Sequence, residues 1–165
     1  MLQKFYPGDY VDSTYSIDFQ AYYDKGYRGL IFDIDNTLVP HGKPSTKESI
    51  ELFDRLHEMG FSTCLISNNQ EPRVRPFAID MKTPFVFNAH KPSRKNYLKA
   101  MEIMHTDKEH TIFIGDQLFT DVYGANRTGI YSILVKPIHP KEEIQIVLKR
   151  YLEKIVLFFY KRKSS

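Results

Sequence analysis

The sequence predicts an α/β protein with a doubly wound, Rossmann-like parallel sheet of five strands. Short apolar runs recur along the 165-residue chain, and segments with apolar residues at helical spacing lie between them. Clusters of Gly, Pro, Asn and Asp separate the two kinds of segment. Strands that alternate with helices at this spacing are typical of a parallel sheet with right-handed crossovers. We expect one domain, 1–165, because a chain of this length can bury one substantial core.

The apolar runs define the expected strands. They span residues 28–33, 61–66, 85–87, 110–114 and 130–135. Each run is short, nearly continuously apolar and followed by turn-forming residues, as is typical of strands that are buried on both faces. The sheet should therefore lie in the interior, between helices.

Capping signals predict where several helices begin and end. Asp18 can cap a short helix that Gly26 ends, because glycine tolerates the left-handed conformation. Ser45 and Glu48 have the spacing of a capping box, and Gly60 ends the helix that they begin. Further helices are expected at 71–80, where Pro76 shortens or kinks the helix, from Ser93 onward, and at 118–128 before Gly129.

The two ends of the chain should flank a core at 28–136. Residues 1–27 are expected to form an extended arm, packed by its aromatic side chains, and the short helix. Residues 137–165 should form a C-terminal helix that ends in basic residues. Its apolar residues at helical spacing are Ile144, Val147, Tyr151, Ile155 and Phe158. Two interpretations remain open: a helix packed on the sheet, which we favour, and a basic amphipathic contact with a membrane.

Composition narrows the class of protein. The formal net charge of +3 is too mild to indicate nucleic-acid binding. The single cysteine, Cys64, lies in an apolar run, which favours a buried core residue in a reducing compartment. No run near the N-terminus is typical of a signal peptide, and none approaches the roughly 20 apolar residues of a spanning helix. We expect a soluble, cytoplasmic protein.

The first expected strand ends in two carboxylates, Asp33 and Asp35, spaced i, i+2. Two acids this close repel each other, and a cation or hydrogen-bond donors would keep both ionised. A metal-dependent site with one carboxylate free to attack would explain the pair. A strand that runs into an ordinary Asp/Asn turn would explain it equally well.

The other strand ends favour a site over a turn. Ser67 and Asn68 follow the second strand, Lys91 follows the third, and Asp116 and Asp121 follow the fourth. Carboxyl ends of parallel strands meet at one edge of a sheet, where ligands bind. We therefore expect acids, a hydroxyl and a lysine from four strands to converge.

Such a set matches the needs of phosphoryl transfer. A carboxylate can attack a phosphate monoester only if a cation offsets the repulsion, and Mg2+ suits a site made of oxygen ligands. Lys91 would place positive charge on phosphoryl oxygens, and Ser67 would donate a hydrogen bond. One aspartate would form an aspartyl-phosphate, and the other would act as acid and base.

The segments 33–38, 67–68, 91–92 and 115–121 resemble, in this order, the four motifs of the haloacid dehalogenase-like (HAD) phosphatases. The resemblance implies a HAD-type sheet, with Asp33 as the nucleophile and Asp35 as the acid and base. It also implies that Asp33, the Asp35 carbonyl and Asp116 bind Mg2+.

The resemblance further implies roles for the surrounding residues. Thr37 would fix the nucleophile loop. The residues expected at the phosphoryl group are Thr37, Ser67, Asn68 and Lys91. Asp121 would act behind the direct ligands or through water.

More narrowly, the arm and motifs look like the YqeG type of bacterial HAD-IIIA phosphatases, which is similar to mitochondrial phosphatidylglycerophosphate phosphatases. Relatives carry caps between the first motifs, and this chain has no room there for a large cap domain. The open site that this implies would accept a bulky anionic substrate. Phosphatidylglycerophosphate is our leading expectation. A soluble phosphometabolite, a phosphoprotein and a non-catalytic binding module are the alternatives.

Charge around the motifs agrees with an anionic partner. Residues 71–99 hold seven basic side chains and two acidic ones, Glu71 and Asp80. The basic side chains are Arg73, Arg75, Lys82, Lys91, Arg94, Lys95 and Lys99. Positive potential there would attract an anionic substrate or the inner face of a membrane, with which we expect peripheral contact. For each of these residues except Lys91, a solvated helix face is the simpler interpretation.

Overall fold

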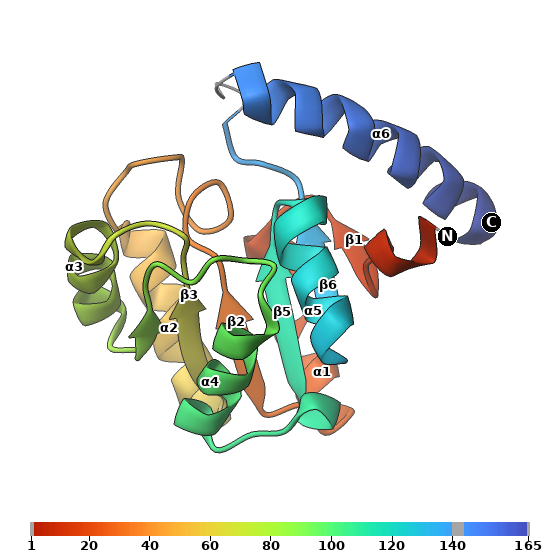
Figure 1. The fold of residues 1–165 in the computed structure, drawn as a ribbon. Coiled ribbons are helices and arrows are strands. Elements are labelled where there is room, and N and C mark those ends of the chain that lie inside the picture. The colour runs from red at the N-terminus through yellow and green to blue at the C-terminus, as the bar shows by residue number, and fades with distance from the viewer. Residues whose placement is uncertain (1, 140–143, 165) are drawn as a thin grey trace.

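The computed structural model describes residues 2–139 and 144–164 and contains a six-stranded parallel sheet in the order β1-β6-β5-β2-β3-β4 (Figure 1). The strands are β1 Asp9–Val11, β2 Gly29–Phe32, β3 Ser62–Ile66, β4 Phe85–Val86, β5 Thr111–Gly115 and β6 Tyr131–Val135. From β2 the chain moves outward to β3 and β4, then returns to the other side of β2 for β5 and β6. The predicted doubly wound sheet is confirmed, and the order of strands reverses between β2 and β5.

The sheet has one strand more than the five predicted. The additional strand, β1, lies in the N-terminal arm and pairs in parallel with β6, Asp9 opposite Ile133. Sequence reasoning missed it because β1 has only three residues, all half-buried, and so shows no alternation of apolar and polar positions.

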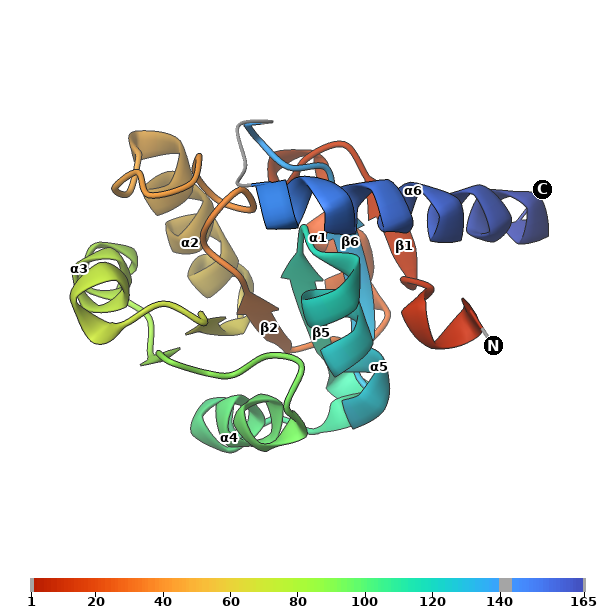
Figure 2. The same cartoon turned by 45° about the horizontal axis from the view of Figure 1, so that its top comes forward.

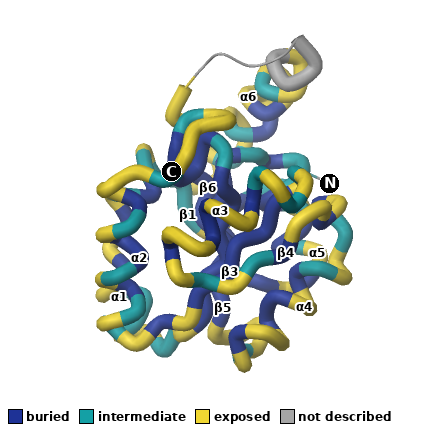
Figure 3. The backbone as a smooth tube through the Cα atoms, turned by 90° about the vertical axis from the view of Figure 1, so that its left-hand side faces the viewer, coloured by how far each residue is buried: buried dark blue, intermediate teal, exposed yellow. Residues whose placement is uncertain are grey.

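Helices cover both faces of the sheet (Figure 2). They are α1 Phe19–Asp24, α2 Lys47–Met59, α3 Glu71–Met81, α4 Arg94–Met104, α5 Tyr123–Thr128 and α6 Ile144–Ser164. On β2, Leu30 and Phe32 pack in a core with α1, α2 and α3, whereas Ile31 faces a second core with α4 and α5. The strands β2, β3, β5 and β6 therefore run through the interior, as the buried segments of Figure 3 show. Short helical turns also occur at η1 Leu2–Phe5, η2 Thr14–Ser16, η3 Lys108–His110 and the π-helical η4 Leu118–Val122.

The start of α2 differs from the prediction by one residue. Thr46, not Ser45, is the N-cap, and its reciprocal partner is Ser49, not Glu48. The Thr46 hydroxyl accepts from Ser49 N at 3.1 Å, and Thr46 N donates to the Ser49 hydroxyl at 2.9 Å. Ser45 instead donates to Asp80 on α3 at 2.5 Å, which ties the two helices together.

Other predicted helix caps are confirmed. Asp18 caps α1 by accepting from Ala21 N at 3.1 Å, and Gly60 ends α2 with φ of 102°. Ser93 is the N-cap of α4, although its side chain makes no capping hydrogen bond.

The C-terminal helix α6 lies across the carboxyl edge of the sheet and not on its face (Figure 1). It contacts η1 and η4, and Val156 packs with Leu118 and Val122. The predicted packing stripe was wrong: Tyr151, Ile155 and Phe158 are exposed. The rest of that stripe, the side chains of Ile144 and Val147, lies outside the described residues. In the described part of the chain, no helix has the length and apolarity that crossing a membrane requires.

Candidate active site

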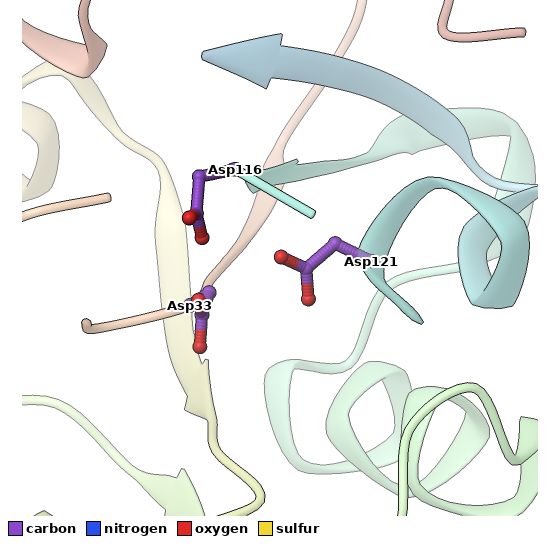
Figure 4. A group of neighbouring side chains, drawn as sticks. All are labelled: Asp33, Asp116 and Asp121. Carbon is purple, nitrogen blue, oxygen red and sulfur yellow. The ribbon is translucent and has the colours of Figure 1, made fainter. Parts of the chain in front are cut away.

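Three buried aspartates meet at the point where the order of strands reverses. Asp33 directly follows β2, Asp116 directly follows β5, and Asp121 lies in η4. One carboxylate oxygen from each lies within 4.8 Å of the other two. Figure 4 shows the three side chains pointing toward a common centre. The structure thus brings together two strand ends and a helical turn, as the parallel sheet predicts.

Lys91 provides the positive charge of this acidic cluster. Its Nζ donates to Asp33 Oδ1 at 2.9 Å and to Asp121 Oδ1 at 2.6 Å, and the lysine is buried. The loop after β4 carries Lys91, and Asn68 fixes that loop by accepting from Lys91 N at 2.7 Å. One ammonium group therefore neutralises part of the negative charge of two carboxylates, Asp33 and Asp121.

Asp116 has a different set of partners. Thr37 Oγ1 donates to its carboxylate at 3.2 Å, and Arg150 on α6 donates both to the carboxylate and to the Asp116 carbonyl. Glu153 in turn accepts from Arg150 at 3.1 Å and from Leu118 N at 3.0 Å. A residue near the end of the chain thus reaches the acidic cluster.

Sequence reasoning missed Arg150 and Glu153. Their i, i+3 spacing is that of an ordinary surface ion pair on a helix, so the sequence gives no sign that both face inward.

Burial dominates the electrostatics of the cluster. It raises the pKa of Asp33 to about 7, with Lys91 opposing the shift and Asp116 adding to it. Burial likewise raises the pKa of both Asp116 and Asp121 to about 6. It would lower the pKa of Lys91, but Asp121 and Asp33 outweigh it and raise that pKa above its usual value. Three carboxyls thus compete for too little positive charge.

This donor set fits a hard divalent cation. All three groups supply oxygen, and they lie close enough to share one ion. Burial raises the pKa of each carboxyl, and a nearby cation would oppose that shift. A bound cation would supply the positive charge that protons otherwise provide.

Asp35 points away from the acidic cluster, toward the start of α3. Its carboxylate accepts from Gly42 N at 2.8 Å, Asn69 Nδ2 at 2.6 Å and Arg73 Nη2 at 2.8 Å. Asn69 and Arg73 were not predicted as partners, although Asn69 directly follows the second motif and Arg73 is one of the seven basic residues. The predicted Mg2+ contact of the Asp35 carbonyl remains a prediction.

The predicted phosphate-binding residues mainly hold loops in this structure. The Ser67 hydroxyl, buried at the end of β3, accepts from Asn69 N at 3.0 Å. Asn68 holds the backbone of Lys91, and Thr37 holds Asp116. Their contact with a phosphoryl group remains a prediction.

The N-terminal arm fixes the loop that follows Asp33. Thr14 Oγ1 donates to the Thr37 carbonyl at 2.8 Å, and Tyr15 OH donates to the Leu38 carbonyl at 2.6 Å. These residues were missed because the arm shows no periodicity. Their contacts tie the loop after Asp33 to the N-terminal arm.

The basic segment 71–99 is more neutralised than its composition suggests. Four of its seven basic side chains form ion pairs: Arg73 with Asp35, Arg75 with Glu71, Lys82 with Asp54, and Lys91 with Asp33 and Asp121. Its attraction for a distant anion is correspondingly weaker.

Comparisons with known proteins agree on one family. A family model described as HAD-hydrolase-like matches residues 88–143, which include Lys91, Asp116 and Asp121. The chain is 37% identical over 166 residues to "Probable phosphatase YqeG" of Bacillus subtilis (strain 168), covering 99% of this chain and 96% of that protein.

Two further similarities are more distant. Phosphatidylglycerophosphate phosphatase 1, chloroplastic/mitochondrial, of Arabidopsis thaliana is 26% identical over 161 residues, covering 90% of this chain and 46% of that protein. The cobalt-bound deoxy-D-mannose-octulosonate 8-phosphate phosphatase of Haemophilus influenzae has a similar structure. Its TM-score is 0.51 at 14% identity, covering 68% of this chain and 80% of that one.

Proposed function

The chain belongs to the HAD-like hydrolases and is a phosphatase of that family, and from this premise we propose that it hydrolyses phosphomonoesters with Mg2+ through an aspartyl-phosphate at Asp33. The observation that carries the proposal is that carboxylate oxygens of Asp33, Asp116 and Asp121 lie within 4.8 Å of one another, with Lys91 paired to Asp33 and Asp121. In this cluster three buried carboxylates share two cations, Lys91 and Arg150, which is the kind of charge arrangement found at functional sites.

Asp33, Asp116 and the Asp35 carbonyl would hold Mg2+, with Asp121 behind them or in contact through water. When bound, Mg2+ supplies positive charge to the phosphoryl oxygens and to the carboxylates around them. Lys91 adds a fixed ammonium next to the nucleophile, and it keeps the Asp33 side chain oriented by their 2.9 Å hydrogen bond.

The proposed reaction has two steps, formation of the aspartyl-phosphate and its hydrolysis. Asp33 forms a bond to phosphorus while the bond from phosphorus to the leaving oxygen breaks, and Asp35 donates a proton to that oxygen. Asp35 then takes a proton from water, whose oxygen attacks phosphorus and releases Asp33 and inorganic phosphate. In the structure Gly42, Asn69 and Arg73 hold the Asp35 side chain away from the acidic cluster, so it must take up a proton and turn toward the leaving oxygen before the first step.

Phosphatidylglycerophosphate is the substrate that we propose. The similarity to the Arabidopsis phosphatidylglycerophosphate phosphatase, which spans 90% of this chain, supports it. The segment between β2 and α2 is a loop, and the segment between β3 and α4 holds only α3 and β4, so neither segment places a cap domain over the site.

The test measures phosphate release from phosphatidylglycerophosphate in liposomes and from an aryl phosphate, with Mg2+ and with EDTA. We expect Mg2+-dependent release that prefers the lipid, and a loss of at least about 10^3-fold in the D33N variant, as for other nucleophile removals. Asp24→Asn, at an exposed position of α1, is the matched control and should retain activity.

The outcomes separate mechanism from substrate. Turnover by D33N without metal overturns the mechanism. Lipid turnover no faster than that of the aryl phosphate overturns the substrate and leaves a soluble phosphate ester or a phosphoprotein to be identified.

A further inference from the structure

Helix α6 exposes six large apolar side chains. They are Leu148, Tyr151, Leu152, Ile155, Phe158 and Phe159, with exposed fractions between 46% and 68%. Their i, i+3, i+4 and i+7 spacing places them on one side of the helix, which we call the α6 apolar face. Glu153 and Val156 lie outside this face and are buried against the protein.

This face is more than scattered surface hydrophobics. Among the described residues, it holds six of the eleven exposed large hydrophobic side chains. Tyr151, Lys154, Ile155 and Phe158 also line a hollow of about 430 Å3 on it. Contiguous apolar surface of this kind marks an interaction site.

The charges on the exposed part of α6 are all positive. The helix has one acidic residue, Glu153, and this residue is buried against Arg150. Helical geometry places Lys154 along one border of the apolar face and Lys149 along the other, whereas the Nζ atoms of Lys161 and Lys163 lie over the rings of Tyr10 and Tyr6. The face is therefore apolar in its middle and cationic at both edges.

We propose that the α6 apolar face docks on an anionic phospholipid bilayer, with the helix lying in the plane of the interface. Apolar and aromatic side chains would enter the boundary between headgroups and acyl chains, while the flanking lysines reach the lipid phosphates. A second copy of the chain fits less well, because a twofold contact between these faces would bring the lysine borders of the two helices together.

Docking in this way would bring the active site to the membrane. Helix α6 crosses the carboxyl edge of the sheet, and its inner side reaches the site through the contact of Arg150 with Asp116 (Figure 2). The inference goes beyond the proposed function, because docking requires neither turnover nor a particular substrate.

The test is flotation of the full chain with vesicles in EDTA. Vesicles of phosphatidylcholine alone are compared with vesicles that contain about one-third phosphatidylglycerol, at low salt and at about 1 M NaCl. We expect binding to the anionic vesicles, weakened at least about tenfold in high salt or by the double substitution Ile155→Glu and Phe158→Glu. Ile79→Glu, on an exposed apolar residue of α3 (66% exposed), is the matched control and should bind like wild type.

Both substituted positions are exposed, so the double variant should fold, and an unchanged unfolding midpoint confirms this. Equal vesicle binding by wild type and the double variant overturns the inference. A second result would also overturn it: wild type sediments as a dimer, the double variant sediments as a monomer, and neither protein binds vesicles. The face would then be a self-association surface. Vesicle binding by D33N at the wild-type level separates this inference from the proposed catalysis.

Discussion

Replacing Lys91 by Met tests the electrostatic account of the acidic cluster. The substitution keeps most of the apolar stem and removes the ammonium group that lies 2.9 Å from Asp33 and 2.6 Å from Asp121. In the metal-free protein, Asp33 and Asp121 would then be buried without their main counter-charge. The cost of this change should depend on whether the carboxyls are ionised.

The magnitude follows from the pKa values. At about pH 8, above the values of about 7 for Asp33 and about 6 for Asp121, both groups are largely ionised. Breaking a buried ion pair then costs about 3–5 kcal/mol. At about pH 5 both are largely protonated, so the loss of Lys91 should cost about 1 kcal/mol, the central value for single substitutions.

The assay is urea denaturation in EDTA at these two pH values, with wild type and variant measured side by side. For a chain of this size, the difference at the higher pH corresponds to a fall in Tm of about 6–20 °C. Lys95→Met, at an exposed position of α4, is the control and should change stability by less than about 0.5 kcal/mol. Equal destabilisation of K91M at both pH values would refute the reasoning, because the lysine would then stabilise the fold by packing alone.

Three further predictions concern the same cluster. Gly115→Ala should cost about 1–3 kcal/mol in urea denaturation, because the added Cβ would meet the Asp121 carboxylate; unchanged stability would contradict this. Arg150→Met should lower the Tm measured without metal, because Asp116 loses the guanidinium group that pairs with it. The increase in Tm on adding Mg2+ should be larger in this variant than in wild type. Equal increases in the variant and in wild type would argue against that ion pair. For wild type, metal-free stability should fall as pH rises from about 4 to about 7, since the raised pKa values mean that the folded state holds more protons than the unfolded state. The Tm rise with Mg2+ should accordingly be larger at about pH 8 than at about pH 5, and calorimetric scans at both values check this.

The parts of the fold that the sequence predicted are those with local causes. Asp18 and Gly60 act within one turn of their helices, so their residue types suffice. The strand β1 depends on pairing with a segment more than a hundred residues away, which no local pattern reveals. Helix α6 was predicted, but the side that it buries was not. Val156 is buried and its neighbour Ile155 is exposed, and periodicity does not say which side of the helix the protein covers.

The same distinction holds in the site. Asp33, Lys91 and Asp116 were predicted to converge because the carboxyl ends of parallel strands meet at one edge. Arg150 reaches the site only because the tail folds back over that edge, and Arg73 reaches Asp35 only because of how α3 is placed. Ion pairs of this kind depend on how elements pack and carry no signature in spacing.

The pairing of β1 with β6 sets an order on folding. Asp9 belongs to the part of the chain that a ribosome releases early, and its partner Ile133 emerges only after the four inner strands. The strands β2, β3, β4 and β5 can associate while β1 still lacks its only neighbour in the sheet. Because β1 has only three residues, all half-buried, and pairs with the late-emerging β6, it should be the last strand to dock and the first to open. Thr14 and Tyr15, which bind the carbonyls of Thr37 and Leu38, follow β1 in sequence, so the loop after Asp33 should be fixed only at the end of folding.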